Sequence, residues 1–314
     1  MKNKLSHINI FSVLFLFVIT TLSVFGCHID NKMEGNNLTK LVDKTFDTFP
    51  GKNFTLKTTS GDVIIKTWDE PKVIVKVFGN EHVMKKINFS FDNNNDGITV
   101  VARKKEEWNI FNFLNNNSHI RFEITLPKNY NSNINTAGGN ISLTDLNGEI
   151  KFKSSGGNIS LTNINGNISA ITSGGNIFTN NTNGKVDIST SGGNIKAIAF
   201  VGDFKGFTSG GDINLSGSEG KVEASTSGGE VSLNYSGENK GINLSTSGGS
   251  ISITLPSNFN ADALLSTSGG SIKCSFKTNN TVKFSSTKIE GKFNDGGNEL
   301  IAKTSGGNIE VMQK

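Results

Sequence analysis

One short motif, repeated at a fixed distance, constrains the fold of this chain more than any other feature of its sequence. Thr, Ser or Ala precedes a Gly-Gly pair, and a polar residue and then Ile or Val follow it. The first glycine of the pair recurs every 18 residues, at Gly138, Gly156, Gly174, Gly192, Gly210 and Gly228. The spacing then loosens by two or three residues to Gly248 and Gly269, a last copy lies at Gly306, and a fainter one lies at Gly61. Such a period indicates stacked structural repeats.

Each repeat reads as two short strands, each introduced by a glycine corner. In the first half Ile159 and Leu161 alternate with Asn158 and Ser160, and the second half starts again after glycines such as Gly166. This alternation predicts strands with one buried and one exposed face. Two folds fit the pattern: a chain of antiparallel hairpins that turn at Gly-Gly, or a parallel solenoid with one coil per repeat.

The solenoid explains why the same residue type stands at the same phase of every repeat. Stacked coils place Ile over Ile in the interior and Gly over Gly at a corner. They also place asparagines such as Asn176 and Asn194 in one outward column, where their side-chain amides can bond along the stack. We therefore predict an all-β fold, a parallel β-solenoid (β-helix) of about 18-residue coils over residues 136–314. Because a corner needs unusual backbone angles, we expect a positive φ at Gly192 or Gly193. We also expect the unit at Gly306 to be a terminal coil with one neighbour.

The flanking segments are strand-like but less regular. Residues 51–135 contain apolar runs at 73–77, 97–101 and 120–126, and we expect them to form an irregular N-terminal β cap on the solenoid. Residues 275–303 depart from the period, with an excursion expected over 288–297.

The N-terminus has the pattern of an export signal. Residues 1–26 begin with Lys2 and Lys4, continue as an apolar run and end at Gly26, directly before Cys27. This predicts a signal peptide, and its last residues resemble a bacterial lipobox, which implies acylation of Cys27. An uncleaved transmembrane anchor is the alternative. Residues 27–50 then form the lipidated Cys and a polar tether. With a lipid on Cys27 or with an uncleaved anchor, the protein is exported and held at a bacterial membrane. We expect the outer membrane or cell surface rather than the inner membrane.

Charge argues against a nucleic-acid partner. The chain has 31 Lys and Arg against 27 Asp and Glu, and removal of Lys2 and Lys4 leaves 29 − 27 = +2. A nearly neutral chain lacks the basic surface on which nucleic-acid binding depends.

The reiterated Ser-Gly-Gly-Asn-Ile units, the preceding Thr125-Leu126-Pro127 and the late Asn294-Asp295-Gly296-Gly297 carry a family resemblance. Over residues 50–314 the chain resembles the bacterial β-strand-repeat putative adhesins, a domain of unknown function related to the head domain of auto-transporter adhesins. The resemblance implies a parallel β-helix-like fold on an exported protein, and no catalytic motif accompanies it.

Reactive residue types are scattered, so we expect no catalytic site, metal site or cofactor. The four histidines lack metal-ligand spacing. Calcium-binding glycine repeats need Asp in every turn, whereas the polar place here holds Asn, Asp212, Glu230 or Ser250. Polysaccharide-cleaving β-helices need a local carboxylate cluster, which these uniform coils lack.

Two residue columns and one cysteine have structural interpretations. The Thr and Ser before each Gly-Gly pair are expected to bond backbone groups at the corner, with an ice-binding ladder as the alternative. Cys274 stands at the interior phase of Leu161 and Leu215, so we expect a buried, small apolar side chain.

The most irregular stretch, residues 104–114, concentrates large apolar side chains. These are Trp108, Ile110, Phe111, Phe113 and Leu114. They are expected to cap the solenoid end or to form an exposed contact patch for a partner or membrane.

Taken together, these patterns predict a non-enzymatic cell-envelope lipoprotein, an adhesin or binding module that presents a repeated β-solenoid surface. A structural or regulatory envelope scaffold is the alternative, and a carbohydrate-active β-helix enzyme is the least favoured. The expected partners are the membrane, through the lipid, and a glycan or envelope protein.

Overall fold

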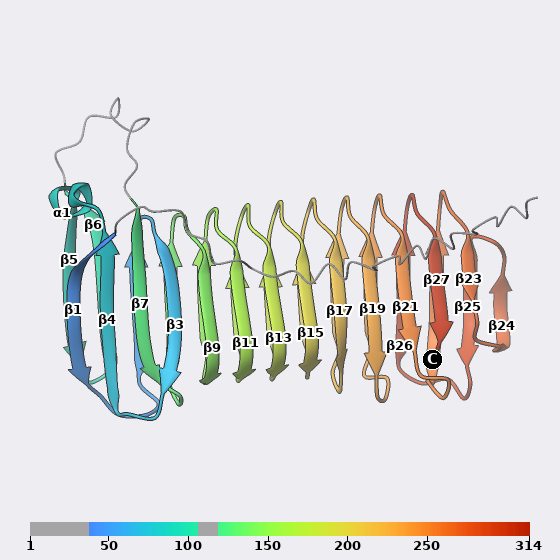
Figure 1. Cartoon of the computed structure of the whole chain (residues 1–314). Coiled ribbons are helices and arrows are strands. Elements are labelled where there is room, and N and C mark those ends of the chain that lie inside the picture. The colour runs from blue at the N-terminus through green and yellow to red at the C-terminus, as the bar shows by residue number, and fades with distance from the viewer. Residues whose placement is uncertain (1–37, 106–118) are drawn as a thin grey trace, which may run out of the picture. The chain divides into compact units, whose positions relative to one another are not determined.

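The computed structural model describes residues 38–105 and 119–314, with backbone alone for Glu81, His82 and residues 278–284. This part of the chain forms strands almost throughout, and its one helix is α1 (Glu81–Lys86). The strands belong to two sheets, of 13 strands (sheet A) and 14 strands (sheet B). Figure 1 shows the strands standing side by side in a row.

The order of the strands in space is as follows. Sheet A contains β1 (Thr39–Asp47), β4 (Lys72–Gly79), β7 (Ile120–Pro127), β3 (Asp62–Trp68), β9 (Ile141–Asn147), β11 (Ile159–Asn165), β13 (Ile177–Asn183), β15 (Ile195–Val201), β17 (Ile213–Ser218), β19 (Val231–Ser236), β21 (Ile251–Leu255), β27 (Ile309–Gln313) and β23 (Ile272–Cys274). Sheet B contains β24 (Thr278–Phe284), β25 (Lys288–Phe293), β22 (Ala261–Thr267), β26 (Glu299–Thr304), β20 (Ile242–Thr246), β18 (Val222–Thr226), β16 (Phe204–Phe207), β14 (Val186–Ser189), β12 (Ile168–Ile171), β10 (Ile150–Ser154), β8 (Asn131–Thr136), β2 (Asn53–Thr58), β6 (Gly97–Lys104) and β5 (Ile87–Asn94).

The middle of the molecule is a parallel β-solenoid, as predicted. Each coil gives one strand to sheet B and the next to sheet A, and equivalent strands pair in parallel with partners 18 residues apart, such as Ile159 with Ile177 and Ile150 with Ile168. Antiparallel hairpins would pair successive strands within one sheet, so this register rules them out.

The core is a set of interior columns between the two sheets. The first residue of each middle sheet A strand points inward and is at most 1% exposed, as for Ile177, Ile195 and Ile213. Larger rings fill the wider places, and Phe200 packs on Phe204 with ring centroids 4.9 Å apart. Each coil therefore buries its apolar face against its two neighbours, and this stacking is the main source of stability in such a rod.

The Gly-Gly corner is explained by close packing of backbones rather than by unusual backbone angles. Neither Gly192 nor Gly193 has a positive φ, so that prediction is wrong. A Cβ on Gly193 would lie 2.0 Å from the carbonyl oxygen of Gly175 in the neighbouring coil, whereas one on Gly192 would find its nearest atom at 3.8 Å. The second glycine is required because nothing larger fits between stacked corners.

Left-handed non-glycine residues lie instead inside the sheet A strands, near the ends of β11, β13 and β15. Asn163 (φ 55°) and Asn181 (φ 54°) adopt this conformation in successive coils, and Ala199 (φ 53°) does so in the next. Asn tolerates it better than most residues. The amides also bond along the stack, because Asn181 Nδ2 donates to Asn163 Oδ1 at 2.9 Å.

The N-terminal end departs from sequence order. The coil made of β2 and β3 lies between the coil of β8 and β9 and the later coil of β6 and β7. Antiparallel strands β5, β4 and β1 then cover the end. The expectation that residues 27–50 form only a tether is wrong for Thr39–Asp47, because this segment pairs along β4 and half-buries Val42 and Phe46 against the core.

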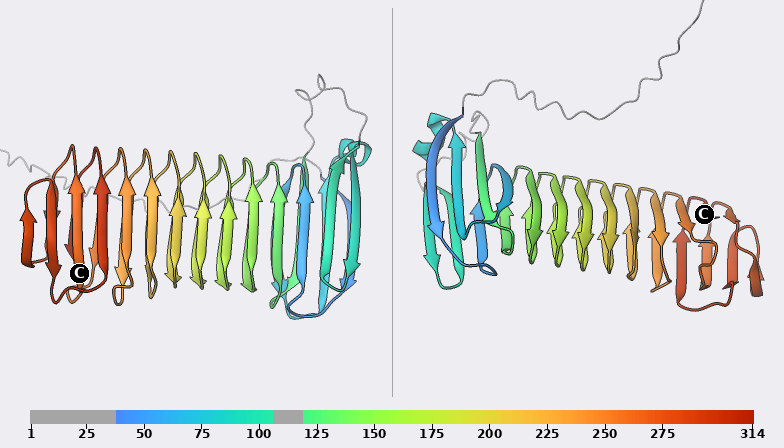
Figure 2. Two further views of the ribbon diagram at one scale, coloured as in Figure 1. Left: turned by 180° about the vertical axis from the view of Figure 1, so that it is seen from behind. Right: turned by 60° about the horizontal axis from the view of Figure 1, so that its bottom comes forward.

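The C-terminal end has a matching inversion. The last coil, β26 and β27, lies between the coil of β20 and β21 and the coil of β22 and β23 (Figure 2). The prediction that Gly306 belongs to a terminal coil is therefore wrong, since that coil has a neighbour on each side. At this end of the rod, sheet A finishes with β23, and sheet B continues past β22 with the antiparallel strands β25 and β24. Phe276 stacks there on Phe293, with ring centroids 4.6 Å apart.

Candidate binding surface

The threonine column at the Gly-Gly corners is internal. Thr190 is 2% exposed, and its Oγ1 donates to the carbonyl oxygen of Gly175 at 2.8 Å. The backbone N–H of Gly193 donates back to the same hydroxyl at 3.3 Å. The same bond from Oγ1 to a neighbouring coil recurs at Thr172, Thr208, Thr226, Thr246, Thr267 and Thr304. These hydroxyls hold coils together, as predicted, and cannot form an ice-binding face.

The asparagine column after the Gly-Gly pair faces outward but is also used within the rod. Asn176 Oδ1 accepts the backbone N–H of Asn194 at 2.7 Å, and Asn194 Oδ1 accepts that of Asp212 at 2.8 Å. Bonding along the stack was predicted, although the donor is the next backbone N–H rather than a second amide.

One outward column of sheet B holds a polar or charged residue in every coil. The column runs in register through Thr99, Thr55, Asn133, Lys151, Ser169, Asp187, Lys205, Glu223 and Asn243. A hydrogen bond from Lys221, reinforced by the charges of Lys221, Lys205 and Lys185, lowers the pKa of Glu223. Glu223 therefore lacks the raised pKa that a general acid needs.

A shallow groove of about 350 Å³ opens at the N-terminal end of this face. Its floor is formed by Thr99, Thr55 and Asn133, which lie side by side on β6, β2 and β8. The turn at residues 94–96 forms one wall, and Glu149 with Lys151 forms the other. Lys151 Nζ lies 3.5 Å from a Glu149 carboxylate oxygen, so this wall carries a paired charge.

The groove depends on a ladder of side chains at its edge. Asn131 Nδ2 donates to Asn53 Oδ1 at 3.1 Å, and Asn131 Oδ1 accepts the backbone N–H of Glu149 at 2.9 Å. Gly97 completes the edge, because a Cβ there would lie 2.0 Å from the Asn53 carbonyl oxygen. The floor therefore offers hydroxyl and amide groups on a fixed backbone, a composition suited to a hydroxyl-rich ligand.

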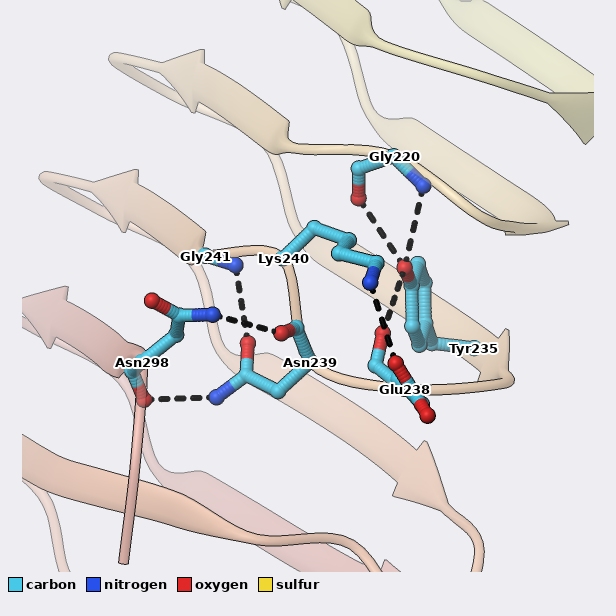
Figure 3. Close-up of polar contacts among 7 residues, drawn as sticks. All are labelled: Gly220, Tyr235, Glu238, Asn239, Lys240, Gly241 and Asn298. Carbon is cyan, nitrogen blue, oxygen red and sulfur yellow. Dashed lines mark hydrogen bonds and ion pairs between the residues drawn. The ribbon is translucent and has the colours of Figure 1, made fainter.

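A second polar cluster lies near the other end of the rod, where one coil is two residues longer (Figure 3). The Tyr235 hydroxyl lies within hydrogen-bond distance of the Gly220 carbonyl (2.9 Å), the Glu238 carbonyl (3.1 Å) and the Gly220 N–H (3.2 Å). Burial raises the pKa of Tyr235. All of these partners are backbone groups, so the tyrosine secures the longer loop rather than facing a ligand.

The residues that the sequence marked as sites fall mostly beyond the structure. Cys27 and the patch of Trp108, Ile110, Phe111, Phe113 and Leu114 lie outside the described residues. Cys274 is in register with Val311 on an interior column, as predicted, and is half-buried because sheet A ends there. Burial raises the pKa of its thiol. Within the two described ranges no three His, Cys, Asp or Glu side chains converge as a metal site would require.

Comparison with known families identifies this architecture. The model of the Toastrack DUF4097 domain, a domain of unknown function, matches residues 51–312. The chain belongs to the Toastrack DUF4097 family. The match spans the regular coils of the Toastrack rod, the inverted coil at each end, and most of the antiparallel caps.

Several solved structures are similar to the Toastrack rod. A putative adhesin from Bacteroides fragilis matches with 13% identity over 88% of this chain and 98% of its own, at a TM-score of 0.44. A putative lipid binding protein from Parabacteroides distasonis matches with 15% identity over 87% and 96%, at 0.45. A putative adhesin from the same organism matches with 13% identity over 86% and 96%, at 0.45. No curated protein matches the chain. In residues 38–105 and 119–314 no helix is long and apolar enough to cross a membrane.

Sequence reasoning missed both the groove and the cluster around Tyr235. The groove brings Asn53 beside Asn131, which lies 78 residues later, through an inversion of coil order. The one available signal was the Asn that begins both β2 and β8, in Asn53-Phe54 and Asn131-Ser132, at the position that Glu149 holds in the Toastrack repeat.

Proposed function

We propose that this protein is a non-enzymatic binding module of the bacterial cell envelope, an adhesin-type rod held at a membrane by a lipid on Cys27. The observation that carries the proposal is the groove at Thr99, Thr55 and Asn133, a polar recess at the end of a long outward column of polar and charged residues. The names of the similar structures, adhesin and lipid binding protein, are consistent with a binding role.

The chemistry of the groove points to a glycan as the ligand. Thr and Asn side chains both donate and accept hydrogen bonds, which matches sugar hydroxyls. The charged groups are Asp96, Glu149 and Lys151, with a net charge of −1, so polyanions are disfavoured. The backbone on which these groups stand is fixed by strand pairing, which reduces the entropy lost on binding.

Binding of purified rod to an array of neutral bacterial glycans tests the proposal. Thr55→Val with Asn133→Ala removes floor groups without changing the strand pairing, and binding should fall about tenfold or more if each lost bond contributes about 1 kcal/mol. Ser169→Ala with Asn243→Ala, on the same face but away from the groove, is the matched control. Equal binding by the two double variants would contradict the groove as the site.

A scaffold role is the second candidate, favoured by the uninterrupted stacking from β8 to β21. A rod that only spaces other components would bind none of the glycans, while its deletion would still alter the envelope. The same array therefore separates the two functions.

A further inference from the structure

The inserted C-terminal coil, β26 and β27, has an unusual relation to its neighbours. Both flanking coils, residues 242–255 and 261–274, precede it in the sequence and are joined to each other by residues 256–260. The flanking coils thus form a continuous unit without it. Within the described rod, the inserted coil is connected only through the link at residues 294–298.

The inserted coil makes the same kinds of contact with both flanking coils. Thr304 Oγ1 donates to the Gly249 carbonyl at 2.8 Å, and Thr267 Oγ1 donates to the Gly307 carbonyl at 2.7 Å. Interior Ile309 lies in register with Ile251 on one side and Ile272 on the other. Since all three coils share one pattern, the two flanking coils can stack directly: Thr267 would then face Gly249, and Ile272 would face Ile251.

The link has the properties of a hinge. Asn294 has a φ of 49°, and Gly296 and Gly297 have φ values of 76° and 146°. The link also crosses the end of β22, because β25 and β26 pair with opposite edges of that strand. Short connections of this kind favour exchange of the attached element between copies.

We propose that two copies of this chain associate by exchanging their β26–β27 coils, each coil filling the slot between residues 242–255 and 261–274 of the other copy. Exchange preserves every hydrogen bond and interior contact of the coil, so only the link and the concentration of copies decide between monomer and dimer. No middle coil can be exchanged in this way, because each has a chain connection on both sides.

The slot lies at the end of the rod opposite β1, the first described strand (Figure 1). If the chain is anchored through Cys27, a premise that rests on the proposed function, exchange would join anchored rods by the ends opposite β1. The exchange itself does not depend on glycan binding or on the lipid.

Cross-linking between differently tagged copies tests the exchange. Ser252 and Glu310 are in register on β21 and β27 and point outward. One full-length copy carries Ser252→Cys and the other Glu310→Cys, both with Cys27→Ser and Cys274→Ser, and the two are refolded together at high concentration. The matched control pair is Asn214→Cys and Ser232→Cys, in register on β17 and β19 in the middle of the rod.

A disulfide-linked heterodimer should form with the Ser252 and Glu310 pair, at a yield at least about tenfold above the mid-rod pair, because only the exchanged coil enters another copy. A single chain with both Ser252→Cys and Glu310→Cys must form the bond internally, which establishes that the geometry permits it. Heterodimer at equal yield from both pairs, or from neither, would overturn the proposal.

Light scattering provides a readout that does not depend on thiols. Deleting residues 295–298 leaves a link that reaches only about 7 Å, whereas the strands on the two sides of β22 are roughly 9.6 Å apart, so the link cannot cross β22 within one copy. The protein should then shift from monomer to dimer. A deletion variant that stays monomeric and folded at every concentration would also overturn the proposal. Loss of glycan binding with exchange intact would instead contradict only the proposed function.

Discussion

Asn239 and Asn298 lie 59 residues apart in the sequence, and each donates its side-chain amide to the backbone carbonyl of the other, at 2.6 and 2.8 Å. Asn239 Nδ2 also donates to the Asn260 carbonyl, and its Oδ1 accepts the backbone N–H of Gly241. This pair fastens the start of the inserted coil to the longer loop before β20 (Figure 3). At the other end of the coil Lys314 Nζ donates to Asn234 Oδ1 at 2.7 Å.

Replacing Asn239 with Ala should therefore destabilise the rod by about 1–3 kcal/mol, because the half-buried Asn239 side chain loses three backbone hydrogen-bond partners. Urea unfolding measures the change. Asn243→Ala, an exposed residue on the neighbouring strand, is the control and should change stability by less than about 0.5 kcal/mol. Equal effects would mean that the Asn239 and Asn298 pair contributes nothing.

The two glycines of one corner should respond very differently to Ala. Gly193→Ala should cost about 3 kcal/mol or more, because its Cβ would press on the Gly175 carbonyl oxygen at 2.0 Å. Gly192→Ala should cost about 1 kcal/mol or less, since its nearest neighbour is at 3.8 Å. Gly307→Ala should behave like Gly193→Ala, because a Cβ there would lie 2.1 Å from the Gly249 carbonyl oxygen. Thermal melts of the three variants check the order.

The buried corner hydroxyls predict a cost for an isosteric change. Thr190→Val keeps the shape of the side chain but removes the donor to the Gly175 carbonyl, so stability should fall by about 1–3 kcal/mol. Thr190→Ser keeps the hydroxyl and should lose less. Chemical denaturation of both variants distinguishes them; a Val variant as stable as the Ser variant would show that the hydrogen bond is not what matters there.

The strand phase is tested by a charge on each face. Ile195→Asp places a carboxylate in an interior column where the side chain is 1% exposed, so a loss of several kcal/mol, about 4 or more, is expected. Asn194→Asp keeps the exposed oxygen that accepts the Asp212 N–H and should cost about 1 kcal/mol or less. Comparable melting temperatures for the two would be incompatible with the observed register.

Acylation of Cys27 remains a prediction from Gly26-Cys27 at the end of the apolar run. Mass spectrometry of the mature N-terminus should find a lipid-modified Cys27, and Cys27→Ser protein should leave the membrane fraction. A Cys27→Ser protein that stays with the membrane would favour the uncleaved anchor.

Much of the rod could be predicted because each coil repeats the same local rules. The 18-residue recurrence of Gly-Gly and the inward Ile of each repeat specify parallel stacking, and the buried hydroxyl of Thr190 follows from its place at a corner. In the middle of a solenoid every coil has the same surroundings, so the burial and hydrogen bonds of one coil predict those of the others.

The order of the coils at the two ends could not be predicted, because coils that repeat the same local rules look alike in the sequence. The unit at Gly306 has the same motif as that at Gly269, and nothing local tells which of them lies outermost. Their order is decided by the antiparallel strands β25 and β24, which leave no other place for the last unit. The backbone angles at Gly192 and Gly193 were mispredicted because a glycine column also results from close backbone approach, which one sequence cannot distinguish from a left-handed turn.

The candidate site was the least predictable part. The groove at Thr55 and Asn133 depends on the inverted coil at the N-terminal end, so its residues come together only in the folded chain. The Trp108 patch and Cys27 remain sequence predictions, since both lie outside the described residues.

Because both caps are closed by inverted coils, the uniform units between β9 and β19 can be varied in number without altering either end. The genetic consequence is that an in-frame duplication or deletion of whole 18-residue units would change the rod length in steps of about 4.8 Å. We expect an insertion that duplicates residues 159–176 to fold with unchanged cooperativity, whereas duplication of the unit at 299–313 would leave one copy without a slot. A gene of this kind can tune how far its product reaches while both ends of the protein stay the same.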